Sequence, residues 1–331
     1  MVSHSKKIRA LGICSGGLDS MLSAVVLREQ GIDVEWINFE TPFFSSEKAR
    51  EASKQIKIPL RVKEITDEYL QMLKNPPRGF GKNMNPCMDC HALMFKIAGE
   101  MMKEENFDFL FSGEVVGQRP MSQTKPSLRY VEKTSGFVGY IVRPLSAKNL
   151  PETIPEKEGF VDRSQLLGFS GRSRKPQIAL AKEYGITDYP APAGGCLLTD
   201  KGFSDRLKDL FEHQESFTKN EIHLLKHGRH IRLKSGEKII IGRTKDDNES
   251  ITQYYDPKKD TLIKIKGSPG PIVLIPQAAG ENSVKFGAAL CIGYSKVSNV
   301  EPTDVLIVTP KGKETVQVLG ISSSDIKQLL I

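Results

Sequence analysis

The sequence feature that most constrains this chain is a six-residue turn, SGGLDS, at positions 15–20. An apolar run ends at Ile13-Cys14 just before it, and a helical pattern begins at Met21 just after it. The order is therefore strand, glycine turn, helix. Two glycines let the backbone approach an anion closely, and the turn directs N–H groups at a helix N-terminus, which favours negative charge. No lysine follows the second glycine, so the turn differs from the loop that grips a transferable γ-phosphate.

Apolar strands alternate with helical patterns over residues 8–112. The expected strands are Ile8–Cys14, Val34–Phe39, Leu60–Ile65 and Phe107–Phe111, and the expected helices lie near 21–30, 46–57, 66–74 and 89–105. This alternation predicts an α/β fold in which helices cover a mostly parallel sheet. Ligands of such sheets bind beyond the carboxyl ends of the strands, where the 15–20 turn falls.

The pattern changes after His230 to short alternating strands separated by glycine and Asp/Asn turns. The expected strands are Ile231–Leu233, Lys238–Ile241, Leu262–Ile265 and Ile272–Ile275, and one helix is expected near 281–293. This pattern predicts a smaller α+β domain at the C-terminus. We expect three parts in the chain: 1–150, 151–224 and 225–331.

The chain of 331 residues is long enough to bury a substantial core. Its net charge of +7 permits nucleic-acid binding without requiring it. No apolar segment approaches the roughly 20 residues that span a bilayer, and residues 1–9 have no signal-peptide pattern. We therefore expect a cytoplasmic protein with no membrane partner, whose cysteines are reduced thiols or metal ligands. Cys14 and Cys291 lie in apolar segments and are expected in the core.

The SGGLDS turn resembles the pyrophosphate loop of the ATP-pyrophosphatase (PP-loop) superfamily, whose members cleave ATP between the α and β phosphates and adenylylate a substrate. The resemblance implies bound ATP and Mg²⁺, with Asp19 as a catalytic residue that helps to hold metal or pyrophosphate. The nucleotide contacts that it implies are Ser15, Gly16, Gly17, Asp19, Ser20, Asn38, Phe39 and Gly113. Phe39 is equally well explained as a core residue. Arg119 either faces phosphate or RNA or is a solvated surface residue.

Three cysteines stand in polar surroundings rich in glycine and proline. Cys87 and Cys90 open a helix in the string NPCMDCH, and Cys196 follows two glycines. Thiolates near a helix N-terminus have lowered pKa values and serve as nucleophiles or metal ligands. The residues alone leave several interpretations: c-type haem attachment, which needs an export signal, a redox dithiol, a zinc site that includes His91, or unrelated buried thiols.

An N-P-x-x-x-C string after a PP-loop domain, with a later cysteine behind a small-residue turn, resembles the tRNA 2-thiouridylases. By position, Cys90 and Cys196 match their catalytic cysteines, whereas Cys87 falls where many of those enzymes have Asp. Iron–sulfur-dependent tRNA thiolases of this superfamily hold a 4Fe-4S cluster with three cysteines and leave the fourth iron open. The resemblance therefore implies that Cys87, Cys90 and Cys196 bind such a cluster. A persulfide on Cys196, released by Cys90, is the alternative route.

Basic residues at two places are candidates for contact with RNA phosphates. Arg172, Arg174 and Lys175 form a basic helix entrance before the Cys196 turn. The C-terminal segment resembles, more weakly, the RNA-binding module of the NFACT family, through the strings RHIRL, IIIGR and DDNE. The RNA contacts which that resemblance implies are Arg229, Arg232, Arg243 and Lys245.

These features together predict an ATP-dependent tRNA uridine thiolase. Residues 1–150 would bind ATP and form the adenylate, 151–224 would carry the third cysteine, and 225–331 would bind RNA. The expected partners are tRNA and a sulfur donor, either a cysteine desulfurase or inorganic sulfide, and a homodimer is compatible with the sequence. Two rivals are another PP-loop ligase, amidating or lysidine-forming, which needs no cysteine triad, and a non-catalytic RNA-binding protein, which would not need so complete a loop.

Overall fold

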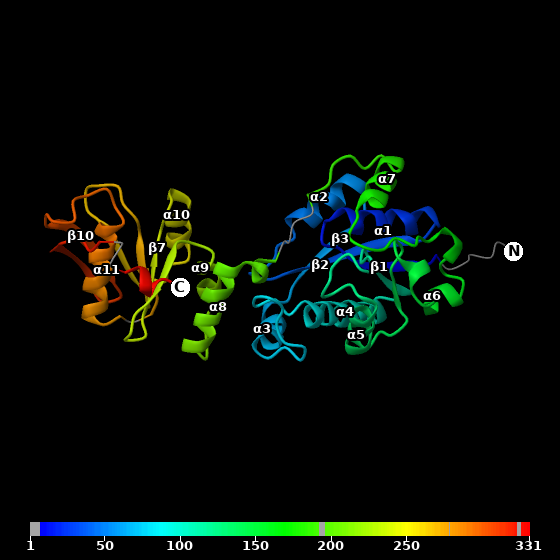
Figure 1. Ribbon diagram of the computed structural model, residues 1–331, viewed down its shortest axis with the longest axis horizontal. Helices are drawn as coiled ribbons and strands as arrows, with labels where there is room; N and C mark the ends of the chain where they lie inside the picture. Colours follow the sequence, from blue (N-terminus) through cyan, green and yellow to red (C-terminus); the bar gives the residue numbers. More distant parts are fainter. Residues whose placement is uncertain (1–6, 192–195, 278, 323–325) are drawn as a thin grey trace. The chain divides into compact units, whose positions relative to one another are not determined.

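The structure is a computed structural model that describes residues 7–191, 196–277, 279–322 and 326–331. The chain divides into two compact units, Met1–Thr199 and Asp200–Ile331, here called the N-terminal and C-terminal units (Figure 1). Each unit has its own sheet and its own hydrophobic core. The N-terminal sheet is parallel and the C-terminal sheet is antiparallel, which confirms the predicted fold class.

The N-terminal unit is built on a five-stranded sheet of order β3-β2-β1-β4-β5. Its strands are β1 (Arg9–Ile13), β2 (Asp33–Glu40), β3 (Leu60–Glu64), β4 (Phe109–Ser112) and β5 (Ile141–Val142). Its helices are α1 (Leu18–Glu29), α2 (Glu47–Ile56), α3 (Thr66–Lys74), α4 (Cys87–Glu104), α5 (Lys125–Ser135), α6 (Ile154–Lys157) and α7 (Lys175–Glu183). Figure 1 shows α1, α2 and α7 on one face of the sheet and α3, α4 and α5 on the other. Because both faces are covered, central strand residues such as Trp36 and Phe109 are fully buried.

The strand order places the SGGLDS turn where a parallel sheet binds its ligands. From β1 the chain continues to β2 on one side, whereas β4 pairs with β1 on the other side. The topology therefore reverses between β1 and β4, and ligands of open α/β sheets bind at such a point, outside the carboxyl ends of the strands. The turn follows β1 and Gly113 follows β4, so both lie at this position.

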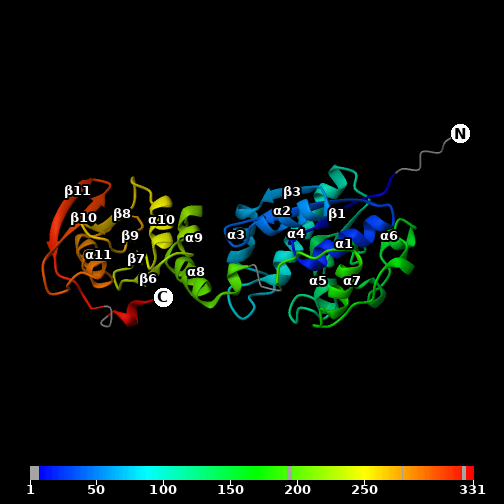
Figure 2. The same ribbon diagram turned by 90° about the horizontal axis from the view of Figure 1, so that it is seen from above.

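The C-terminal unit is built on a six-stranded antiparallel sheet of order β11-β10-β8-β9-β7-β6. Its strands are β6 (Arg229–Arg232), β7 (Lys238–Ile241), β8 (Thr261–Ile265), β9 (Val273–Ile275), β10 (Thr303–Thr309) and β11 (Gly312–Val318). Its helices are α8 (Lys201–His213), α9 (Lys219–Leu224), α10 (Lys245–Gln253) and α11 (Glu281–Gly293). Figures 1 and 2 show α10 and α11 on opposite sides of this sheet.

The predicted boundary at residues 224/225 differs from the boundary in the structure, which lies between Thr199 and Asp200. Helix α8 belongs to the C-terminal unit because its Asp209 binds two residues of the sheet there. The Asp209 Oδ2 atom accepts hydrogen bonds from Arg232 Nη2 at 2.6 Å and from Lys238 Nζ at 3.0 Å. The expected segment 151–224 is therefore not one unit, because its first part folds with the parallel sheet and its last part with the antiparallel sheet.

No helix in the described part of the chain is long and apolar enough to cross a membrane.

Candidate nucleotide loop and cysteine cluster

The SGGLDS turn connects β1 to the N-terminus of α1. Gly17 is the N-cap residue, and no side chain caps the helix there, so the first-turn N–H groups point out of the helix without a side-chain acceptor. Gly16 has φ +76°, and a Cβ atom at this position would lie 2.3 Å from the carbonyl carbon of Lys48 in α2. The position therefore requires glycine for its backbone conformation and for the close approach of α2. N–H groups beside the positive end of a helix dipole can bind phosphate.

The hydroxyl groups of the turn face each other. The Oγ atoms of Ser15 and Ser20 are 3.3 Å apart, and the Ser15 N–H also donates to Ser20 Oγ. Cys14, just before the turn, accepts a hydrogen bond from the Gly16 N–H at 3.3 Å. Burial raises the pKa of the Cys14 thiol to about 12. Cys14 is therefore a protonated core residue, as the sequence predicted.

Asp19 belongs to a polar cluster that the sequence did not reveal. Its Oδ2 atom accepts a 2.7 Å hydrogen bond from Gln118 Nε2, and Gln118 Oε1 accepts from Gln177 Nε2 at 3.2 Å. Burial raises the pKa of Asp19, while the Gln118 bond and the nearby charges of Arg174 and Arg119 lower it. Helix α7 thus brings Gln177 and the neighbouring Arg174 to the turn, although the sequence had placed Arg174 with RNA.

Three buried polar atoms around this cluster have no hydrogen-bond partner among the described residues: Asp19 Oδ1, Arg174 Nε and Gln177 Oε1. Buried polar atoms in folded proteins are nearly always paired, so three orphans in one cluster indicate a ligand. An anion beside the helix N-terminus would satisfy the Arg174 Nε–H donor, and a divalent cation would satisfy the Asp19 Oδ1 acceptor. The residues present therefore fit the phosphates of ATP with Mg²⁺.

The other predicted nucleotide residues lie around the turn in different ways. Gly113 packs against it, and a Cβ atom there would lie 2.5 Å from the backbone carbon of Asp19. Asn38 donates to the Cys14 carbonyl at 2.7 Å, and its buried Oδ1 has no partner in the described part of the chain. The Phe39 side chain is only 2% exposed and lies in the core of the unit.

Cys87, Cys90 and Cys196, here called the cysteine cluster, come together in the N-terminal unit. Cys87 is the first residue of α4, and Cys90 follows in the same helical turn. The thiols lie close enough that charge on Cys196 raises the pKa of Cys90 and charge on Cys87 raises that of Cys196. Two neighbours bind the sulfur atoms: Asn85 Nδ2 donates to Cys87 Sγ at 3.2 Å, and the Tyr69 hydroxyl donates to Cys90.

Two hydrogen bonds hold the segment of Cys196 in the N-terminal unit. The Leu197 N–H donates to the Phe43 carbonyl at 3.1 Å, and Asn83 Nδ2 donates to the Thr199 carbonyl at 2.7 Å. The Phe43 ring packs on Tyr69, with 5.5 Å between the ring centroids. The two glycines before Cys196 fall in residues 192–195, which lie outside the described residues.

The donor chemistry of the cysteine cluster fits a metal or an iron–sulfur cluster. Burial raises the pKa of Cys90 far above its ordinary value. Burial and, to a smaller extent, the charge of Cys87 raise the pKa of Cys196 to about 11, although a backbone hydrogen bond from Leu198 lowers it. Three thiolates are stable together only beside a compensating cation. Within the described residues, however, no three His, Cys, Asp or Glu side chains are arranged as a metal site. Neither a zinc site nor an iron–sulfur site is therefore shown.

A buried ion-pair network connects the turn to the cysteine helix. Glu114 accepts hydrogen bonds from Arg143 Nε and His91 Nδ1, both at 2.9 Å. Burial favours the neutral carboxyl group, but Arg143 and His91 hold the pKa of Glu114 at about 2. Gly113 packs against the SGGLDS turn, and the next residue, Glu114, binds His91, which follows Cys90 in the sequence. Residues 113 and 114 therefore connect the turn to the cysteine cluster. The sequence offered one signal for Arg143, a charged residue directly after a buried strand.

Each basic residue predicted to contact RNA in the C-terminal unit has a partner within that unit. The partners are Asp209 for Arg232, Asp247 for Arg243, Glu249 for Lys245 and the Tyr294 ring for Arg229. An RNA phosphate would have to compete with these partners. In the N-terminal unit, Arg172 and Lys175 are exposed at the start of α7.

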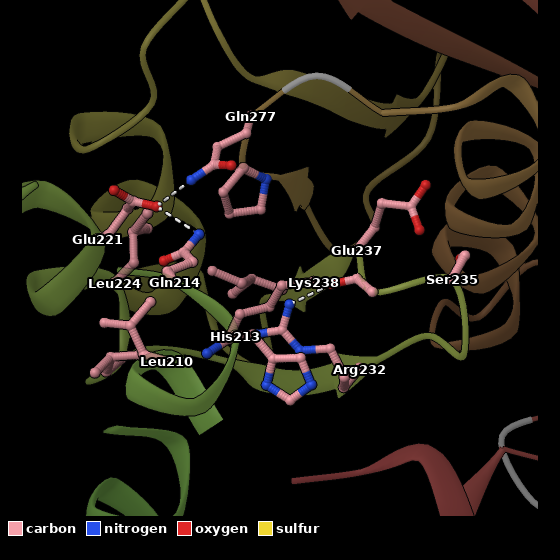
Figure 3. A pocket seen from close by; sticks show the side chains of 14 residues that line it. Leu210, His213, Gln214, Glu221, Leu224, Arg232, Ser235, Glu237, Lys238 and Gln277 are labelled. Carbon is pink, nitrogen blue, oxygen red and sulfur yellow. Dashed lines mark hydrogen bonds between the residues drawn. The ribbon is translucent and has the colours of Figure 1, made fainter. Parts of the chain in front are cut away.

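A polar pocket of about 150 Å³ lies between α8, α9 and the β6–β7 hairpin (Figure 3). In it, Gln214 Nε2 and Gln277 Nε2 both donate to Glu221 Oε1, at 3.2 and 3.1 Å. Arg232 also lines this pocket, and its guanidinium group donates to the Gly236 carbonyl at 2.6 Å. The lining groups largely bind one another, so we assign no ligand to the pocket.

The N-terminal unit thus has the architecture of a parallel α/β domain, with the SGGLDS turn at the switch point of its sheet. Its residues 6–154 match the family described as thiamine biosynthesis protein (ThiI), and residues 228–330 match the family described as NFACT protein RNA binding domain. The two matches, each over less than half of the chain, confirm the resemblance of the N-terminal unit to a PP-loop domain and of the C-terminal unit to the NFACT module.

Curated relatives align with part of the chain. A probable tRNA sulfurtransferase of Oceanobacillus iheyensis is 25% identical over 157 residues, and one of Thermoanaerobacter sp. is 30% identical over 155 residues. Each alignment covers 44% of this chain but only 37% and 39% of the two relatives. The chain thus spans well under half of the length of these relatives.

Solved structures show weaker similarity. A predicted subunit of tRNA methyltransferase from Methanocaldococcus jannaschii is 18% identical to this chain, with a TM-score of 0.36. The alignment covers 53% of this chain and 75% of that subunit. The C-terminal part of a fibronectin/fibrinogen-binding protein from Streptococcus suis is 14% identical to this chain, with a TM-score of 0.29. The alignment covers 74% of this chain and 94% of that protein's solved part. Both scores are too low to establish a shared fold.

Proposed function

We propose that this protein is an ATP-dependent tRNA uridine thiolase. The observation that carries the proposal is the connection through residues 113 and 114. Gly113 packs on the backbone of Asp19 in the SGGLDS turn, and Glu114 binds His91 beside Cys90. A group activated at the turn would therefore form near the thiols. The match to the ThiI family and the relatives named probable tRNA sulfurtransferase support the same chemistry.

In the first proposed step, a uracil carbonyl oxygen of tRNA attacks the α-phosphorus of ATP, and the bond to the bridging oxygen of pyrophosphate breaks. The first-turn N–H groups of α1 and the Arg174 guanidinium would bind the departing pyrophosphate and stabilise its developing charge. Asp19 would hold Mg²⁺, and Ser15 and Ser20 would donate hydroxyl hydrogen bonds. This assigns Arg174 to the nucleotide, whereas Arg172 and Lys175 keep the predicted contact with RNA.

In the second proposed step, hydrosulfide attacks the adenylylated uracil carbon, and AMP leaves with the original carbonyl oxygen, so that thiouridine forms. A 4Fe-4S cluster held by the cysteine cluster would supply an open iron that binds hydrosulfide. Tyr69 and Asn85 would orient the sulfur atoms of Cys90 and Cys87 through the hydrogen bonds described above. The hydrosulfide would come from inorganic sulfide or from a cysteine desulfurase.

The C-terminal unit would bind the tRNA. Its residues 228–330 match the NFACT RNA-binding domain, and the chain carries seven more basic than acidic residues, 47 against 40. Because phosphate contacts dominate RNA affinity, this binding should weaken steeply as salt rises.

The proposal is tested by measuring AMP, pyrophosphate and thiouridine from ATP, Mg²⁺, sulfide and an unmodified tRNA transcript. The wild-type protein should form all three products in equal amounts. Asp19→Ala should form none, because the buried carboxylate at the turn is lost. Asp188→Ala, which removes an exposed carboxylate from the same unit, is the matched control and should keep full activity. Wild-type rates in Asp19→Ala would contradict the role of the turn.

A second candidate is a PP-loop ligase that does not use its cysteines. It is favoured by one observation, that the described residues contain no preformed group of three metal ligands. The two candidates differ in the behaviour of Cys196→Ala. A thiolase should lose thiouridine on this change, whereas the alternative ligase should still consume ATP and modify its acceptor at the wild-type rate.

A further inference from the structure

We infer that RNA docks on the open part of the C-terminal sheet, on the face of β8, β10 and β11 that carries Lys264, Lys266 and Lys313. The inference rests on the proposed RNA-binding function of this unit and deepens it, because it names the surface. The three lysines are here called the lysine face. None of them belongs to the set of basic residues that the sequence singled out.

The alternation of side chains along β8 places two of these lysines on one face of the sheet. Ile263 and Ile265 are buried in the core that α11 covers. Leu262 packs in the smaller core on the opposite face, together with Ile251 of α10. Successive residues of a strand point to opposite faces, so Lys264 and the following Lys266 lie on the side of Leu262. Both lysines are exposed, so they lie where neither core covers the sheet.

The strand register extends this face across β10 and β11. Opposite pairs on neighbouring strands share a face, which gives three rows. The rows are Leu262–Val308–Lys313, Lys264–Leu306–Thr315 and Lys266–Asp304–Gln317. Strand spacing puts the three lysines within roughly 16 Å of one another. Asp304 is the single acidic side chain in these rows.

A groove runs beside the lysine face. It has a volume of about 530 Å³ and is lined by Lys264, Lys266, Leu306, Asn248 of α10 and the loop 267–270. Figure 2 shows β10 and β11 at the outer edge of the sheet, on the far side of β8 from α10. The loop reads Gly-Ser-Pro-Gly, so its small residues leave the groove open for a phosphate chain.

The charge on this face is only partly neutralised within the unit, because Asp304 is the single carboxylate against three lysines. Among the described residues, Lys264, Lys266 and Lys313 have no ion pair, whereas Lys245 pairs with Glu249. A lysine beside a carboxylate attracts phosphate weakly, because the carboxylate repels it. Three lysines without an ion pair, two of which line the groove, complement a polyanion, and the match to an RNA-binding domain makes RNA its occupant.

The test compares two triple variants of the full chain in tRNA binding from 50 to 400 mM salt. The first is Lys264→Gln, Lys266→Gln and Lys313→Gln. Three phosphate contacts contribute about 0.9 each to the salt slope, so the slope should fall by roughly two to three and the affinity near 150 mM by about 100-fold. Substitutions of exposed side chains should leave the unfolding midpoint unchanged.

The matched control is Lys201→Gln, Lys208→Gln and Lys285→Gln. It removes the same charge from the same unit, but each of these lysines is paired with a carboxylate on its own helix. The salt slope of the control should change by less than one. An equal loss in both triple variants would contradict the inference, because it would show a dependence on net charge alone.

A change of opposite sign gives a second test. Asp304→Asn removes the one negative charge from the lysine face, so tRNA affinity should rise several-fold at 100 mM salt. If wild-type protein binds no tRNA, the proposed function itself fails. If the wild-type protein binds tRNA with a steep salt slope and the first triple variant keeps that slope, the RNA-binding function stands but the lysine face is not its RNA site. The lysine face would then fit another polyanion, such as an acidic protein surface.

Discussion

The conformation of the SGGLDS turn gives a quantitative prediction for Gly16→Ala. A residue with φ +76° must adopt a left-handed conformation, which destabilises alanine by roughly 1–2 kcal/mol. In addition, the new Cβ atom would lie 2.3 Å from the carbonyl carbon of Lys48. Crowding of this kind adds roughly 1–3 kcal/mol, because backbone of α2 cannot move aside as a flexible side chain would. The total expected loss is therefore about 2–5 kcal/mol.

Gly31→Ala separates these two contributions. Gly31 has nearly the same backbone conformation, φ +77°, but a Cβ atom there meets nothing within 4 Å. Gly31→Ala should therefore lose only the conformational part. In thermal unfolding of the N-terminal unit, where roughly 2–4 °C corresponds to 1 kcal/mol, Gly16→Ala should melt several degrees below Gly31→Ala.

ATP binding provides the second readout for this pair. Gly16→Ala displaces the turn and should weaken ATP affinity at least tenfold, whereas Gly31→Ala lies at the far end of α1 and should leave it unchanged. Equal melting temperatures and equal ATP affinities for the two variants would refute the packing of the turn against α2.

Three further predictions concern the ion-pair network, the cysteines and the C-terminal unit. The pKa of Glu114 is held at about 2, so its stabilisation is complete above the ordinary carboxyl range and is lost as pH falls towards 2. Glu114→Gln should lack this pH dependence in urea unfolding and should lose roughly 3 kcal/mol at neutral pH, because buried Arg143 loses a partner. Each Cys→Ala change in the cysteine cluster should lower iron bound after anaerobic reconstitution, whereas Cys291→Ala should not; equal iron in all variants would argue against the cluster. Removing the C-terminal unit from Asp200 onward should weaken tRNA binding and flatten its salt dependence, and unchanged affinity would leave that unit without its proposed role.

Much of the N-terminal fold could be predicted from the sequence because its strands are buried on both faces and read as continuous apolar runs. The strand that ends at Ile13 and the turn at 15–20 follow from that pattern. Helix α5 is not among the predicted helices, although Thr124 caps it and accepts a hydrogen bond from the Ser127 N–H. In the C-terminal unit, β11 was missed because it is an edge strand with exposed polar residues and little apolar signal, whereas β10 was missed despite its apolar run Val305–Val308.

The candidate site was only partly readable from the sequence, because local patterns do not reveal distant partners. The turn and the three cysteines carry motifs, so they were found. Arg174 was assigned to RNA because it stands in a basic run, and only the fold of α7 brings it to Asp19. Tyr69 and Arg143 carry no motif and act through tertiary contacts.

The measurement that tests the central claim most directly is nucleoside mass spectrometry of tRNA. The protein, reconstituted anaerobically with iron and sulfide, is incubated with ATP, Mg²⁺, sulfide and an unmodified tRNA transcript. The account predicts thiouridine that depends on ATP and disappears in Asp19→Ala and Cys196→Ala. Release of AMP and pyrophosphate without any thiouridine, unchanged by Cys196→Ala, would contradict it.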